Sequence, residues 1–156
     1  MDSKVHGIDH EHNGSARPLV GALLRRPFMA VRARVVERLH EAGFTDLQPA
    51  HLAVFQHPGP QGRSPGDIAR GAQASKQATN NLLAQLERTG YLHRKVKPGN
   101  RRERTVELTH RGHAAIRAIR ASVDEVELRW RTELGAADYE ALRSLLERLN
   151  QLLDTD

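Results

Sequence analysis

Apolar residues recur at helical spacing near both ends of the chain. Between residues 18 and 42 they stand four or seven positions apart, at Val20, Leu24, Val31, Val35 and Leu39. This spacing predicts an amphipathic helix, with Pro27 as a kink or a restart. A second stripe, close to a heptad seam, consists of Leu142, Leu145, Leu146, Leu149, Leu152 and Leu153. It predicts a closing helix whose apolar side packs either within one chain or between two.

The segment after the first helix is rich in turn residues. Gly43 and the stretch 45–49 end that helix, and residues 50–56 predict a short second one. Residues 57–65, with the sequence HPGPQGRSP, have the composition of a loop. At the start of the chain, residues 1–16 are polar and aperiodic, and we expect them to form a disordered tail.

Two helices in close succession are predicted by their caps. The Ser-Pro pair at 64–65 is typical of a helix start, and this helix runs to about residue 70 or 71. A link at 72–74 precedes Ser75, which caps a further helix that ends at Gly90. The pattern is therefore a helix, a tight turn and a second helix.

A hairpin follows this pair of helices. The runs 91–97 (YLHRKVK) and 102–108 (RERTVEL) are strand-like, and Pro-Gly-Asn at 98–100 separates them. Thr109 can then cap a long helix to about Glu133, before Gly135 or Ala136 opens the last one. The predicted fold class is mainly α with a small β-hairpin.

The helix after Ser75 has a polar side that is free of acidic residues until Glu87. With about 100° per residue, the predicted buried side consists of Ala78, Leu82 and Leu86, with Thr79 and Leu83 at its margin. The opposite side consists of Lys76, Gln77, Asn80, Asn81, Ala84 and Arg88. Asn and Gln can pair bidentately with adenine and Lys donates to guanine, so this side suits base edges in a major groove. The alternative interpretation is an ordinary polar surface helix.

Positive charge is concentrated in the middle of the chain. The whole chain has 24 Lys and Arg against 19 Asp and Glu, and residues 63–111 have 11 basic and 4 acidic side chains, a net charge of +7. In and around the predicted hairpin the basic residues include Lys95, Lys97, Arg101, Arg102 and Arg104. This pattern favours contact with a polyanion such as DNA, through phosphates or the minor groove. The alternative is a solvated surface with chance clustering.

The composition argues against several other classes of protein. The absence of cysteine excludes disulfides, thiolate nucleophiles and Cys-based zinc sites. The chain has neither an 18-residue apolar run nor a signal-peptide pattern, so we expect a cytoplasmic protein without a membrane partner. We find no phosphate-binding glycine loop, nucleophile elbow or paired-acid arrangement, and therefore expect neither enzymatic activity nor a cofactor.

The histidines raise the alternative of a metal site. His6, His10 and His12 lie in the predicted tail, while His110 and His113 stand one helical turn apart, a spacing that can chelate a metal. The spacing supplies no third ligand for that pair, so we expect no metal site. A protein that responds to zinc through its tail remains a separate hypothesis.

Residues 64–112 resemble the multiple-antibiotic-resistance-regulator (MarR) family without a gap. The helix pair ends in LERTGY at 86–91, similar to the family's LE-x-x-G-(hydrophobic) junction, and a basic wing follows. The second strand closes in LTHRG at 108–112, similar to the family's L-T-x-x-G. Two positions depart from the pattern. Asn100 replaces the acid of the wing tip, and Gln73 stands where the family often has glycine.

The resemblance implies a winged helix-turn-helix domain at 49–108, flanked by dimerisation helices at 17–48 and 109–156. It also implies a homodimer that binds a pseudo-palindromic operator in double-stranded DNA and regulates transcription, as a repressor relieved by a small ligand. The family's DNA-contacting positions correspond to Ser75, Lys76, Gln77, Asn80 and Asn81, with Arg101 or Arg102 as the wing arginine. Arg88, Lys97 and Arg104 complete the expected DNA contacts.

Members of the family sense phenolic or other lipophilic compounds between the helical scaffold and the DNA-binding domain. In this chain the expected lining of such a pocket is Phe28, Arg32, His51 and Phe55. The alternative, from another class, is a helical protein-interaction module with only nonspecific affinity for nucleic acid. Neutralising Lys76, Asn80 or Arg102 would leave that module unaffected, whereas a regulator would lose its operator.

Overall fold

The computed structural model describes residues 17–56, 59–97 and 99–153, with the backbone alone at 97 and 101–103. Its elements in chain order are α1 (Val20–Glu41), the 3₁₀ helix η1 (Pro49–Ala53), α2 (Pro65–Gly71), α3 (Lys76–Arg88), β1 (Leu92–Lys97), β2 (Asn100–Leu108), α4 (His110–Leu134) and α5 (Ala136–Leu153). The predicted fold class and order of elements are confirmed. The tail predicted at 1–16 lies outside the described residues.

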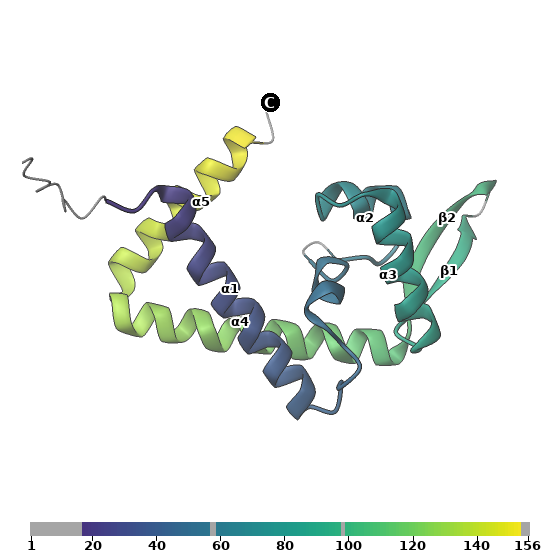
Figure 1. Cartoon of the computed structure of the whole chain (residues 1–156), viewed down its shortest axis with the longest axis horizontal. Coiled ribbons are helices and arrows are strands. Elements are labelled where there is room, and N and C mark those ends of the chain that lie inside the picture. The colour runs from purple at the N-terminus through teal and green to yellow at the C-terminus, as the bar shows by residue number, and fades with distance from the viewer. Residues whose placement is uncertain (1–16, 57–58, 98, 154–156) are drawn as a thin grey trace, which may run out of the picture.

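The molecule has two parts, joined by the long helix α4 (Figure 1). At one end lie the start of α1, the second half of α4 and the helix α5. At the other end, α2, α3 and the hairpin gather over the first half of α4. In the described part of the chain, no helix is both long and apolar enough to cross a membrane.

The predicted helix starts are confirmed by their hydrogen bonds. Ser64, Ser75 and Thr109 each accept a bond of 3.1 Å at the side-chain oxygen, from the backbone N–H three residues later. Each cap satisfies one of the donors that a helix leaves unpaired at its N-terminus. In α2, the Asp67 carboxylate also accepts a bond from the backbone N–H of Ser64, which completes a capping box.

The core fills the space between the helix pair, the hairpin and α4. Its fully buried large side chains include Leu39, Leu47, Ile68, Leu83, Leu86, Tyr91, Leu92 and Val106. The Tyr91 hydroxyl donates to Asp46 Oδ1 at 2.5 Å, and the Arg111 guanidinium lies 4.3 Å from the centre of the Tyr91 ring. Burial, and then the hydrogen bond to Asp46, raises the pKa of Tyr91, so the phenol remains a neutral donor.

The hairpin is antiparallel, with Leu92 opposite Leu108 and Val96 opposite Arg104. Leu92, Val106 and Leu108 are buried against the helices, as their alternation predicts. Val96, which the same alternation predicts to pack inward, is instead 50% exposed. Val96 lies next to the irregularity in the register between Val96 and Lys97, close to the turn of the hairpin.

Two short segments differ from their predictions. The helix predicted at 50–56 is the five-residue 3₁₀ helix η1, because its backbone bonds run from each N–H to the third carbonyl before it, as from Val54 to His51. Pro27 lies inside the continuous helix α1, so the helix does not restart there.

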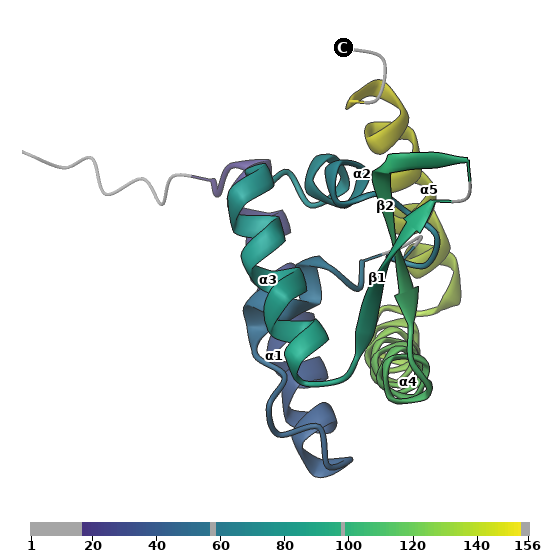
Figure 2. The same cartoon turned by 90° about the vertical axis from the view of Figure 1, so that its right-hand side faces the viewer.

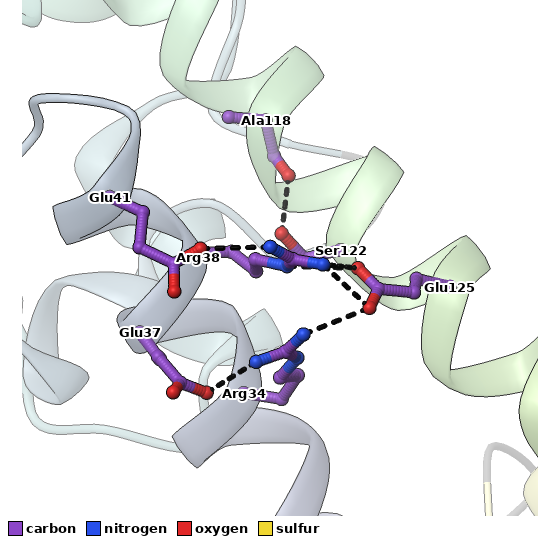
Figure 3. A network of polar contacts seen from close by, with 7 residues as sticks. All are labelled: Arg34, Glu37, Arg38, Glu41, Ala118, Ser122 and Glu125. Carbon is purple, nitrogen blue, oxygen red and sulfur yellow. Dashed lines mark hydrogen bonds and ion pairs between the residues drawn. The ribbon is translucent and has the colours of Figure 1, made fainter.

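An ionic cluster joins α1 to α4 (Figure 3). Arg38 donates to both carboxylate oxygens of Glu125, at 2.7 to 2.9 Å, and Arg34 donates to the same carboxylate at 2.9 Å. Glu37 and Glu41 lie one turn along α1 and accept from these two arginines. The hydrogen bonds from Arg38, followed by those from Arg34, lower the pKa of Glu125 to about 2.

The cluster makes the stability of the fold depend on pH. Because the pKa of Glu125 in the folded protein lies below its ordinary value of 4.5, its stabilisation is complete above that value and is lost as the pH falls toward 2. We expect thermal melts to show that wild type exceeds Glu125→Gln in Tm at pH 6, and that the difference shrinks between pH 4.5 and 2. Glu140→Gln, which removes an exposed acid from α5, is the control. A difference in Tm that stays constant with pH contradicts this assignment.

Candidate nucleic-acid interface

Helix α3 and the hairpin lie at the same end of the molecule (Figure 2). Each α3 candidate for DNA contact is exposed, namely Ser75, Lys76, Gln77, Asn80, Asn81 and Arg88. The side chain of Ser75 caps the N-terminus of α3. The next two side chains, Lys76 and Gln77, project into solvent. The face predicted to meet base edges is therefore accessible.

The buried side of α3 is rotated from the prediction. Thr79, Leu83 and Leu86 are at most 1% exposed, whereas Ala78, predicted as buried, is exposed. Leu83 and Leu86 are the large residues that anchor α3 in the core, and Thr79 lies on the same line, four positions before Leu83. Ala78 falls about 100° away from the centre of that face. The rotation leaves Asn80 and Asn81 exposed.

The turn between α2 and α3 depends on an unusual backbone conformation. Gln73 has a φ of 50°, in the left-handed region that glycine adopts most easily. The N–H groups of Gln73 and Ala74 bond to the carbonyls of Arg70 and Ala69, at 3.1 and 3.0 Å, which closes the C-terminus of α2. Gln73 thus keeps the geometry that a glycine would supply at this position.

Glu87, the acid on α3, is paired with the hairpin. It accepts from the backbone N–H of Arg94 at 2.9 Å and from the Arg94 guanidinium at 2.7 and 2.8 Å. Burial opposes ionisation, but these bonds outweigh it and lower the pKa of Glu87. The pair fixes the wing against α3 and neutralises the acid nearest to the polar face. Pattern reasoning missed this pair, since the two residues lie on different elements.

The wing carries several further basic residues. Arg104 is exposed on β2, and Lys95 forms an ion pair with Glu107 across the hairpin. The side chains of Lys97, Arg101 and Arg102 lie outside the described part of the structure. On the outer edge of β2, Val106 exchanges backbone bonds of 2.7 and 2.9 Å with residues 62 and 63. These bonds tie the wing to the segment before α2.

A pocket of about 370 Å³ lies between α1, α4 and the η1 region. Of the predicted ligand contacts, Phe28, Arg32 and Phe55 line it. The lining continues with Val31, Val35, Leu52, Gln56, Gly59, Ile116, Ile119, Arg120, Val123 and Asp124. Sequence reasoning did not name the α4 residues, although Ile116, Ile119 and Val123 have the spacing of one helix face.

The fourth predicted ligand contact, His51, faces away from this lining. Its side chain is buried, with Nδ1 accepting from the backbone N–H of Gln48 and Nε2 lying 3.0 Å from Gln85 Oε1 on α3. His51 therefore joins η1 to α3.

A larger apolar groove lies between the start of α1 and α5. Its exposed leucines include Leu23, Leu24, Leu142, Leu145 and Leu149, each between 38% and 59% exposed. Trp130 is half-buried and lines this groove.

Among the described residues, no three His, Asp or Glu side chains gather in a way that could hold a metal ion. His110 and His113 are both exposed on the first turn of α4. The tail histidines lie outside the described residues.

Comparison with known proteins finds relatives over most of the chain. The HTH-type transcriptional repressor Rv2887 of Mycobacterium tuberculosis is 28% identical over 130 residues, which cover 83% of this chain and 92% of the relative. The crystal structure of the M. tuberculosis MarR family protein Rv2887 in complex with salicylic acid is 27% identical, with a TM-score of 0.62, and the match covers 86% of this chain and 98% of that one. A crystal structure of MarR matches 89% of this chain and all of its own, with a TM-score of 0.73 and 21% identity, which shows the fold.

A helix, a tight turn, a second helix and a two-stranded basic wing make this chain a winged helix-turn-helix protein. Residues 42–103 match the model of the MarR family. The chain is similar to MarR family proteins over this region and over most of its length, as its resemblance at 64–112 predicts.

Proposed function

We propose that this protein is a dimeric, sequence-specific DNA-binding regulator that represses transcription and is modulated by a small aromatic acid. The observation that carries the proposal is the exposed face of α3, where Lys76, Gln77, Asn80 and Asn81 project and the acid of the same helix, Glu87, is paired with Arg94. Such side chains discriminate bases in the major groove, and an unpaired carboxylate there would repel the phosphates.

The wing supplies the second grip on DNA. Arg104 is exposed, and its neighbours Lys97, Arg101 and Arg102 add three further positive charges around the tip of the hairpin. Contacts from these residues to phosphates or the minor groove would fix the position of α3 without reading bases. A regulator of this kind acts in the compartment that holds the chromosome, which we propose is the bacterial cytoplasm.

The pocket between α1 and α4 fits an aromatic acid. Its walls are mainly apolar, and Arg32 and Arg120 line it with guanidinium groups that can pair with a carboxylate. The relative Rv2887 has been crystallised with salicylic acid and with p-aminosalicylic acid, which supports this class of ligand. We therefore include Phe28, Arg32 and Phe55 in the ligand site.

The groove between α1 and α5 supports a homodimer. A single chain leaves the leucines of this groove in water, and contiguous apolar surface of this kind usually marks a protein interface. Two chains joined there would present two α3 helices to successive major grooves of a pseudo-palindromic operator.

The proposal is tested by comparing the protein's affinity for the DNA upstream of its own gene with its affinity for a scrambled duplex of equal length. We expect a specificity gap of about 10³ and a steep salt dependence. Asn80→Ala is expected to weaken binding to the operator about tenfold and to relax the preference at one base pair. Asn150→Ala makes the same chemical change on α5 and serves as the control.

Two results would contradict this function. Equal and weak binding to both duplexes, repeated over genomic fragments, would leave only a nonspecific basic surface. An Asn80→Ala variant that binds every sequence as wild type does would remove α3 from base reading.

A further inference from the structure

The short helix η1 lies between the ligand pocket and α3. Leu52 on η1, and Phe55 just after it, line the pocket, and η1 also packs against α1 and α3. Its five residues form a 3₁₀ helix, whose hydrogen bonds have poorer geometry than those of an α-helix. A segment of this kind moves more readily than the long helices beside it.

On the pocket side, η1 is held by an arginine. Arg32 donates from Nη2 to the carbonyl oxygen of Pro49, the first residue of η1, at 2.5 Å. The same guanidinium lies 5.4 Å from the centre of the Phe28 ring and lines the pocket. Arg32 therefore belongs both to the pocket and to the anchor of η1.

On the opposite side, η1 is joined to α3 by a histidine. Because His51 Nδ1 accepts from the Gln48 N–H at 3.0 Å, the neutral ring carries its proton on Nε2. That N–H donates to Gln85 Oε1 at 3.0 Å. Gln85 stands one helical turn after Asn81, on the helix proposed to read bases.

These two contacts form a continuous connection from the pocket to α3. A carboxylate bound in the pocket competes with the Pro49 carbonyl for Arg32, because it adds a negative charge and can accept two parallel bonds from the guanidinium, whereas the carbonyl oxygen is neutral. We propose that an anionic ligand draws Arg32 away from Pro49, and that η1 then shifts and moves α3 through the His51–Gln85 hydrogen bond. Gln85 is a positioning residue in this scheme, and the inference rests on the proposed ligand-modulated DNA binding.

The test separates ligand binding from its effect on DNA, with salicylate as the probe. Wild type is expected to lose about tenfold or more of its operator affinity at saturating salicylate, within the usual range of allosteric coupling. Gln85→Met keeps the length of the side chain but removes the acceptor. We expect the affinity of this variant for salicylate, measured by calorimetry, to lie within about twofold of that of wild type. At saturating salicylate, however, its operator affinity should fall by less than about threefold.

Salicylamide, tested with the wild-type protein, probes the role of charge without any mutation. It keeps the phenol ring but lacks the carboxylate that would compete for Arg32. We expect salicylamide to occupy the pocket, as seen by displacement of salicylate, while operator affinity stays within about twofold. Gln151→Met on α5 repeats the side-chain change away from η1 and should respond to salicylate as wild type does.

The outcomes distinguish this inference from the function on which it rests. If Gln85→Met keeps the full response to salicylate, the connection through His51 is wrong while the ligand-modulated regulator stands. If saturating salicylamide releases DNA as salicylate does, the step at Arg32 is wrong. If wild type binds salicylate without any change in operator affinity, the proposed effector class and the connection fail together.

Discussion

Gly112→Ala is expected to destabilise the protein by about 3 kcal/mol, because the fold leaves no room for a methyl group there. A Cβ at this position would lie 2.0 Å from the Tyr91 carbonyl oxygen and 3.1 Å from its carbonyl carbon. Both atoms belong to the backbone of a fully buried residue, so they cannot rotate away. Tyr91 O also accepts from the N–H of Thr109 at 3.1 Å, so a shift of the Tyr91 backbone would disturb this bond at the start of α4.

Thermal or urea unfolding of purified protein measures this effect. A loss of about 3 kcal/mol corresponds to a fall in Tm of roughly 6–12 °C for a chain of this size. Gly66→Ala in α2 is the matched control, since its Cβ would meet no atom closer than 3.7 Å and alanine favours a helix. A Gly112→Ala protein as stable as Gly66→Ala would show that the junction between Tyr91 and α4 is looser than its geometry indicates.

Gly112 also shows why the LTHRG segment at 108–112 could predict the start of α4 from sequence alone. Thr109 caps α4 and Gly112 allows that helix to approach Tyr91, so both residue types follow from one close contact. The caps at Ser64 and Ser75 were predictable in the same way, because a helix N-terminus needs a local acceptor. Features that depend on neighbouring residues in the chain were therefore within reach of the sequence.

Features set by distant contacts were not. The rotation of α3 depends on which leucines reach the core. The sequence pattern predicted Ala78 at the centre of the buried side, whereas the structure buries its neighbour Thr79. His51 was predicted as a ligand contact from the family resemblance, but its side chain bonds to Gln85, which lies 34 residues away. In the MarR pattern Gln73 was a departure, and its left-handed backbone is imposed by the closure of α2.

The leucine stripe of α5 illustrates the same limit for assembly. Periodicity predicted a packing seam but not its partner, and in the single chain Leu145 remains 59% exposed. Since the leucines that line the groove between α1 and α5 are exposed, the groove supports the alternative in which a second chain completes the seam. That alternative makes DNA affinity depend on the same leucines.

Leu145→Glu is therefore expected to convert the proposed dimer into a monomer. The carboxylate would be placed in an apolar interface without a partner, and its desolvation opposes association. A monomer meets one half-site at a time, so operator affinity should fall by about 10²- to 10⁴-fold, the gain that linking two binding modules provides. Sedimentation velocity and operator titration at matched protein concentrations measure the two effects.

Leu128→Glu provides the matched control for this change. Leu128 is 66% exposed on α4 but does not line the groove, so the same substitution should leave both the dimer and its operator affinity close to wild type. If Leu145→Glu sediments as wild type does, the groove is not the interface. If it becomes monomeric yet binds the operator undiminished, one copy of α3 suffices and the paired reading of two major grooves is wrong. If Leu145→Glu loses both the dimer and operator affinity while Leu128→Glu keeps both, DNA binding by α3 depends on dimerisation through the exposed leucines of α5.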